Sequence, residues 1–164
     1  MTIRKIEIER LCVISSKPFE GVVTALKASV GHPDMGQFVR SVNNTRTFAE
    51  LESVIHKGLG RTGLMMFMEL DLGAILRKET GLDTPKSVRF LVGNPLIMKE
   101  MVRHAPGAGS YAPVTILVDE RPDGVHLSYD RMASLLAPFG KPAALAVARD
   151  LDAKIENLLQ ESAE

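Results

Sequence analysis

Alternating hydrophobic and polar positions are clearest in the second half of the chain. Apolar residues recur at every second position over residues 114–119 and 125–129, and the turn Arg-Pro-Asp-Gly at residues 121–124 joins these segments. A period of two is typical of strands, and an Asp-Gly step supplies the positive φ angles that a tight turn needs. The pattern therefore predicts a β-hairpin, preceded by a strand over residues 87–92.

Two further strands are predicted nearer the N-terminus, at residues 6–14 and 64–71. A proline, Pro18, follows the first of them, and proline suits the first turn of a helix. The apolar residues beyond it recur at spacings of three and four, as on the buried face of a helix. These residues are Phe19, Val22, Val23, Leu26 and Val30.

Residues 31–60 separate this helix from the second strand, and we expect them to form a helical insertion. Their first part, residues 31–46, is polar and predicts a loop with at most a short helix. Thr47 and Glu50 have the spacing of a capping box, in which each side chain satisfies a free amide at a helix start. A helix is therefore predicted over residues 48–58, with buried positions at Phe48, Leu51, Val54 and Ile55.

The turn Gly93-Asn94-Pro95 ends the third strand and begins a helix. Asparagine is a common N-cap residue, and proline suits the first helical turn. A helix N-terminus after a glycine turn also binds anions, but this turn holds no lysine or further glycine, so we favour capping. The positions expected to be buried in this helix are Ile97, Met98, Met101 and Val102.

A long amphipathic helix is predicted over residues 142–159, and we favour its covering the sheet over its pairing with a second copy. Its apolar positions recur at steps of four and three, and its charged positions are expected to lie outside. The apolar set is Ala144, Ala148, Leu151, Ile155 and Leu158, and the outer set is Asp150, Asp152, Lys154 and Glu156.

Composition narrows the class of protein. The 164 residues suit a single domain, and 20 basic residues balance 20 acidic ones, so nucleic acid is not an expected partner. Cys12 is the single cysteine, which excludes an intramolecular disulfide and favours a reducing cytoplasm. No apolar run is long enough for a membrane helix or a signal core, so we expect a soluble, unexported protein with no membrane partner.

One strand carries candidate acid–base chemistry. In residues 64–71, strict alternation places Met65, Phe67, Glu69 and Asp71 on one face. If that face is enclosed, desolvation and mutual repulsion raise the pKa of at least one carboxyl group and make a general acid or base. The favoured alternative is that the strand leaves the core at Glu69, so that both acids are solvated.

His126 and Ser128 share the outer face of the predicted hairpin, where an exposed histidine beside a serine is the common arrangement. No third residue at a suitable spacing completes a nucleophilic triad.

The four histidines are scattered, so no metal site is predicted, and the eight methionines are interpreted as core filling. Tyr111 follows a G-x-G sequence that precedes a strand, which excludes a dinucleotide fingerprint; its side chain either packs on the core or lines a cleft.

Several segments of the chain resemble a known family, the domain of unknown function 302 family. The resemblance rests on FMELDLGAILRKETG, SVRFLVGNPLIMKEMV and YAPVTILVDERPDGVHLSYDRMASLLAPFG, together with SSKPFEGVVTALKASV at the first helix. It implies an α+β fold similar to the TATA-binding protein, with a curved, mainly antiparallel sheet and helices on one side. It also implies a homodimer and no particular activity. Members carry I-D-H-A where this chain has Leu70-Asp71-Leu72-Gly73, so Asp71 matches and the histidine is absent.

Three functions stay open from the sequence. The first is a binding module for a small apolar or amphipathic ligand, such as a tetrapyrrole, with no cofactor assigned. The second is an enzyme that uses Glu69 and Asp71 as acid and base, with His126. The third is a structural dimer or an interaction domain. For the binding module, the expected wall is Met65, Phe67, Tyr111 and Tyr129, and the expected polar anchor is Asp71 or Asn94.

Overall fold

The structure, a computed structural model, describes residues 1, 3, 5–83 and 85–164. Its centre is a five-stranded sheet in which every neighbouring pair is antiparallel, in the order β1-β5-β4-β3-β2. This arrangement, with helices on one side, confirms the predicted α+β class. The strands are β1 (Arg10–Ser15), β2 (Met65–Asp71), β3 (Ser87–Gly93), β4 (Val114–Arg121) and β5 (Gly124–Asp130).

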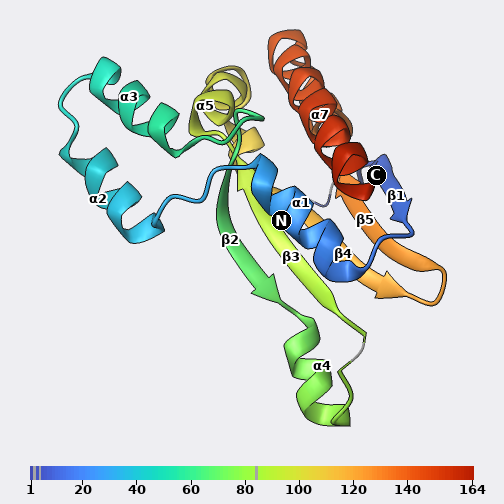
Figure 1. Ribbon diagram of the computed structural model, residues 1–164. Helices are drawn as coiled ribbons and strands as arrows, with labels where there is room; N and C mark the ends of the chain where they lie inside the picture. Colours follow the sequence, from blue (N-terminus) through green and yellow to red (C-terminus); the bar gives the residue numbers. More distant parts are fainter. Residues whose placement is uncertain (2, 4, 84) are drawn as a thin grey trace.

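The helices differ in how they meet the sheet (Figure 1). Helices α1 and α7 lie over one face, the pair α2 and α3 lies to one side of it, and α4 extends past the strand ends. Two short 3-10 helices, η1 and η2, complete the chain. The bounds are α1 (Phe19–Ser29), α2 (Met35–Asn44), α3 (Phe48–Gly58), α4 (Gly73–Thr80), α5 (Pro95–His104), η1 (Pro106–Tyr111), α6 (Met132–Leu136), η2 (Ala137–Phe139) and α7 (Pro142–Ala163).

The core lies between the sheet and helices α1 and α7. Because side chains alternate across a strand, every second residue of β3, β4 and β5 is buried there. The predicted inward positions of α1 and α7 are also confirmed. The buried strand residues are Val88, Phe90, Val92, Val114, Ile116, Val118, Val125, Leu127 and Tyr129.

The opposite face of the sheet is open. On the edge strands, the side chains of Ile14 and Met68 are 55% and 48% exposed. Leu70 and Arg89 are also exposed, and Leu91 and Leu117 are partly buried. One face of the sheet therefore presents an apolar surface that no helix of the described chain covers.

Strand β2 does not alternate strictly, so the predicted faces of its residues are wrong. The register shifts between Met66 and Met68, where a β-bulge inserts Phe67. Met66 pairs with Val92 on the helix side, whereas Met68 pairs with Leu91 on the open face. Met66 therefore shares the side of Glu69 and Asp71, while Met68 lies on the other.

Residues 31–60 form two helices; a loop with a possible short helix was predicted for the first part, where α2 spans ten residues. Asp34 accepts a hydrogen bond from the Gln37 amide and caps α2. Thr47 caps α3, as predicted, but Glu50 accepts from the Arg46 amide, so the capping box is only half formed. Because this pair lies beside the sheet, only Ile55 of the predicted α3 set is buried (Figure 1). That these residues are an insertion stays a prediction.

Three smaller differences follow from local packing. The first strand begins at Arg10, later than predicted; Glu9 before it donates to the Ser134 hydroxyl at 3.1 Å and accepts from the Arg131 amide at 2.8 Å. In α5 only Met101 is fully buried, and the other three predicted positions are partly exposed. In the hairpin, Gly124 has a positive φ of 139°, whereas Asp123 does not.

Candidate functional site

The residues predicted as a ligand wall do not gather at one place. Phe67 and Asn94 line a small apolar cleft of about 120 Å3 at the start of α5. Asn94 caps that helix by accepting from the Leu96 amide at 2.8 Å, as predicted. Met65 is fully buried, and Tyr129 is 1% exposed. Of this set, Tyr111 and the largely buried Tyr129 border a larger groove, which is the strongest candidate site.

The groove crosses the open face of the sheet and has a volume of about 560 Å3. Cavities that hold small organic ligands span roughly 300–1,000 Å3, so the groove is large enough for one. Strands β3 and β4 supply its apolar floor through Leu91 and Leu117. Its walls are Leu72, Tyr111, Pro113 and Leu135.

Tyr111 owes its place in this wall to η1, which it ends. Its ring packs edge-on against Phe139 of η2, with 6.5 Å between ring centroids. Such T-shaped pairs stabilise the position of both rings. Packing between two short 3-10 helices therefore holds Tyr111 in the groove wall.

Polar groups occupy a few positions of the groove. Arg10 on β1 and Asp130 on β5 form an ion pair with 2.6 Å between Nε and Oδ1, and Asp130 lies across from Thr115 of β4. At the centre, Arg89 donates a hydrogen bond to the Thr115 hydroxyl at 3.1 Å. Ser110 and Ser128 also line the groove. A mainly apolar lining with a few polar groups is typical of sites for amphipathic molecules.

Glu69 and Asp71 lie together in a different cleft, of about 410 Å3, on the helix side of β2. Each carboxylate is paired: Glu69 with Lys27 at 2.6 Å and Asp71 with Arg77 at 2.5 Å. Their side chains are 38% and 46% exposed, so the face is not enclosed. Asp71 also accepts from the Ala74 amide at 2.9 Å, at the start of α4.

These contacts lower the pKa of Asp71, chiefly because Arg77 donates a hydrogen bond to its carboxylate. The condition for a raised pKa is therefore not met at this residue. A carboxyl with a lowered pKa is ionised at neutral pH and does not donate a proton there. Its ion pair stabilises the fold above the unfolded-state pKa, and this stabilisation is lost as the pH falls through the lowered folded-state pKa.

We predict that the Asp71 carboxyl titrates below the ordinary value of about 3.9 in a carbon-13 NMR titration. In Arg77→Gln the pKa of Asp71 moves back toward that value, because the guanidinium no longer favours the charged form. The matched control is Arg40→Gln on α2, which leaves the pKa of Asp71 unchanged. A pKa above the ordinary range in the unmodified protein would contradict this prediction and support an acid role.

His126 does not join these carboxylates. It lies on β5, three strands from β2, so the two sites are about 14 Å apart at ordinary strand spacing. The ring is 8% exposed, and its Nε2 lies 2.9 Å from the Asp123 carboxylate at the hairpin tip. This hydrogen bond lowers the pKa of Asp123. His126 is thus bound within its own hairpin.

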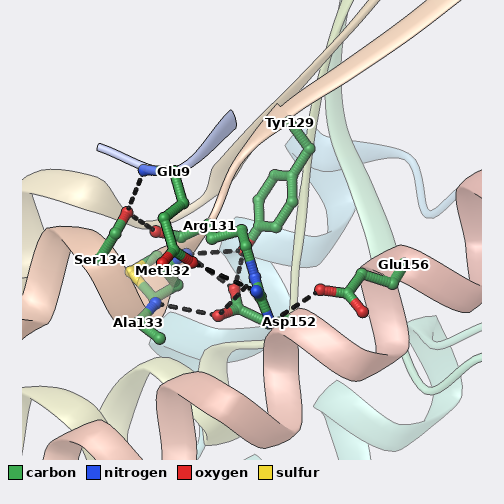
Figure 2. A network of polar contacts seen from close by, with 8 residues as sticks. All are labelled: Glu9, Tyr129, Arg131, Met132, Ala133, Ser134, Asp152 and Glu156. Carbon is green, nitrogen blue, oxygen red and sulfur yellow. Dashed lines mark hydrogen bonds and ion pairs between the residues drawn. The ribbon is translucent and has the colours of Figure 1, made fainter. Parts of the chain in front are cut away.

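The sequence reasoning missed a buried polar network at Asp152, shown in Figure 2. Asp152 was expected outside α7, but its side chain is fully buried. It accepts hydrogen bonds from the Tyr129 hydroxyl at 2.7 Å and from the amides of Met132 and Ala133 at 2.7 and 3.0 Å. A signal was present: Asp152 follows Ala148 by four residues, so it falls on the buried face.

Arg131 extends this network toward the surface (Figure 2). Its guanidinium lies 3.9 Å from Asp152, 2.9 Å from Glu156 and 3.2 Å from Glu9. Burial, with the hydrogen bond to Asp152, raises the pKa of Tyr129. Since the carboxylate of Asp152 satisfies the amides that begin α6, the network has a structural role and holds α6 against α7.

The residues that the structure describes hold neither a metal-binding cluster nor a membrane-spanning helix. Over 1, 3, 5–83 and 85–164, no group of three histidine, cysteine, aspartate or glutamate side chains is placed to hold a metal ion. None of the helices in the same residues has the length and apolarity to cross a membrane. Cys12 is exposed and unpaired on the open face of β1.

Comparison with known proteins agrees with the fold. The crystal structure of an uncharacterized conserved protein DUF302 from Bacillus stearothermophilus superposes with a TM-score of 0.65 at 15% identity, covering 93% of this chain and 97% of that one. No curated protein matches the chain. The family model "Domain of unknown function DUF302" matches residues 38–162. With more than half of its length matched and the expected fold present, the chain belongs to the DUF302 family.

Proposed function

We propose that the protein is a binding module for a small amphipathic molecule, held in the groove on the open face of the sheet. The observation that carries this proposal is the apolar floor of that groove, formed by Leu91 and Leu117 where an uncovered sheet face meets water. Apolar side chains that line a groove together with a few polar groups are typical of a small-molecule site. Of the predicted wall, Tyr111 and Tyr129 border the groove, whereas Met65 does not.

The volume of about 560 Å3 sets an upper size for the ligand. It suits a fused aromatic or a medium-length aliphatic body, and an elongated part of a tetrapyrrole fits with its remainder in solvent. The polar groups lie at intervals along the groove, which favours a molecule with a polar end. We propose that the protein acts in the cytoplasm, which its exposed and unpaired Cys12 supports.

The proposal is tested with N-phenyl-1-naphthylamine, an uncharged dye that fluoresces in apolar sites. We expect saturable binding to the unmodified protein and at least a tenfold loss of affinity in Leu117→Glu, because a carboxylate on the floor must be desolvated. The matched control is Leu82→Glu, at a leucine that is 62% exposed after α4 and outside the groove.

Circular dichroism and thermal unfolding establish that both variants are folded before binding is compared. Equal affinities for Leu117→Glu and Leu82→Glu would place the dye elsewhere and overturn the proposal. Absence of saturable binding to the unmodified protein, at dye concentrations up to its solubility, would overturn it as well.

The second candidate is an enzyme that uses Glu69 and Asp71 as acid and base. The observation that favours it is the shared cleft, which Lys86 and Arg77 also line. Against it stand the ion pairs of both carboxylates and the lowered pKa of Asp71. His126 takes no part in this candidate, because it lies three strands away.

A homodimer is also proposed, alongside ligand binding. Apolar side chains of α4 supply surface for it: Ile75 is 74% exposed and Leu76 is 43% exposed. Helix α4 extends past the sheet, where a second chain can approach it without obstruction (Figure 1).

A further inference from the structure

Three arginines lie on the open face of the sheet, and they differ in their partners. Arg10 pairs with Asp130 at 2.6 Å, and Arg121 pairs with Asp119 at 2.5 Å. Arg89, on the central part of β3, has no carboxylate within 4.0 Å among the residues that the structure describes. Its guanidinium donates to one neutral group, the Thr115 hydroxyl. The other two charges are thus neutralised, and Arg89 leaves one positive charge on this face.

The surroundings of Arg89 are apolar. Across the sheet its nearest neighbours are Leu70 on β2 and Leu117 on β4, which pair with it directly. Leu91 follows two residues along the same strand and therefore on the same face. Leu72, at the end of β2, also lines the groove. These leucines offer an apolar surface beside the charge, and the exposed Arg89 is accessible to an anion from solvent.

Thr115 adds a second donor at the same point. Its oxygen accepts the hydrogen bond from Arg89 at 3.1 Å, so its own proton remains available to another acceptor. A guanidinium and a hydroxyl that converge in this way offer two donors to one oxyanion group. Arginine presents a planar fork that matches the two oxygens of such a group.

We propose that Arg89 and Thr115 form the anion-binding end of the groove, so that the ligand is an apolar body bearing a single oxyanion group. This inference rests on the proposed function and names the chemical class of its ligand. The apolar body lies on Leu91 and Leu117, toward Tyr111, and the oxyanion accepts from Arg89 and Thr115. The ion pair of Arg10 and Asp130 lies one strand away, because the pairing of Ile116 with Tyr129 places Asp130 beside Thr115, and this pair contributes no net charge.

A matched pair of dyes tests this inference. 8-Anilinonaphthalene-1-sulfonate and N-phenyl-1-naphthylamine share one aromatic body and differ by the sulfonate group. In the unmodified protein we expect the sulfonate to bind at least tenfold more tightly than the neutral dye. In Arg89→Gln this preference disappears: affinity for the sulfonate falls about tenfold, and affinity for the neutral dye is unchanged.

Two further variants separate charge from shape and position. Arg89→Lys keeps the positive charge without the planar fork, so it retains part of the preference for the sulfonate. Arg40→Gln, at an exposed arginine of α2 away from the groove, keeps all of it. Added salt weakens sulfonate binding to the unmodified protein and has a smaller effect in Arg89→Gln.

The outcomes distinguish the inference from the proposed function. If both dyes bind to the groove but Arg89→Gln leaves the sulfonate affinity unchanged, the anion-binding role is overturned and the groove is retained. Equal losses for both dyes in Arg89→Gln would assign Arg89 to the shape of the groove and also overturn the role. If neither dye binds saturably to the unmodified protein, both proposals fail together.

Discussion

Replacing Asp152 with alanine lowers the free energy of unfolding by about 3–5 kcal/mol, the range seen when one partner of a buried charged network is removed. The carboxylate is fully buried and accepts from Tyr129, Met132 and Ala133. Without it, these donors lose their acceptor inside the protein, and Arg131 loses the anion beside its guanidinium. Urea unfolding at pH 7, followed by circular dichroism, measures the loss.

The matched control is Asp150→Ala, on the exposed side of the same helix. It changes the free energy of unfolding by no more than about 0.5 kcal/mol, as surface substitutions usually do. Asp152→Asn keeps the shape of the side chain but removes its charge and one acceptor, so its loss is intermediate. A loss below about 1 kcal/mol in Asp152→Ala would show that water replaces the carboxylate in this network.

The Asp152 network also connects the core to the proposed site. The Tyr129 hydroxyl and the Met132 amide both donate to Asp152, and the Met132 amide also donates to the Tyr129 hydroxyl. Both residues border the groove. Leu135, one turn further along α6, is part of the groove wall. Since Asp152 fixes the start of α6, it also fixes the position of that wall. A binding site on a rigid scaffold requires support of this kind from behind.

The sheet and its main helices were predictable from the sequence because each strand or helix buries only one of its faces. Val114, Ile116 and Val118 face the helices, while Thr115 and Leu117 face the groove, so the strand shows a period of two. Ala148, Leu151 and Ile155 repeat at helical spacing for the same reason. These patterns require no knowledge of partners, since any neighbour that buries one face produces them.

The parts that could not be predicted depend on contacts distant in the sequence. The bulge at Phe67 arises where β2 adjusts its pairing with β3, and nothing in residues 64–71 marks it. Asp152 is satisfied by residues of α6, about twenty positions earlier in the chain. The unpaired charge of Arg89 is visible only when its cross-strand neighbours are known to be leucines. Burial of one face leaves a regular spacing of apolar residues in the sequence, whereas the choice of a hydrogen-bond or ion-pair partner leaves no such spacing.

Replacing Gly31 with alanine lowers the free energy of unfolding by about 3 kcal/mol, at the upper end of the cost of overpacking. A Cβ atom there would lie 1.9 Å from the Gly58 carbonyl oxygen and 2.8 Å from the Gly60 amide nitrogen. These are backbone atoms, held in place because the amides of Gly31 and Gly60 both donate to the Leu64 carbonyl at 2.9 Å. The clash is therefore relieved only by moving α3 away from β2.

The matched control is Gly21→Ala, at an exposed position of α1 where the nearest atom to a new Cβ is 4.0 Å away. Alanine favours the helix over glycine by up to about 1 kcal/mol, so this substitution raises the free energy of unfolding. The two glycine variants are thus expected to shift the midpoint of urea unfolding in opposite directions. An unchanged or raised midpoint for Gly31→Ala would mean that residues 31–60 move freely relative to the sheet, and that the contact between Gly31 and Gly58 does not constrain the fold.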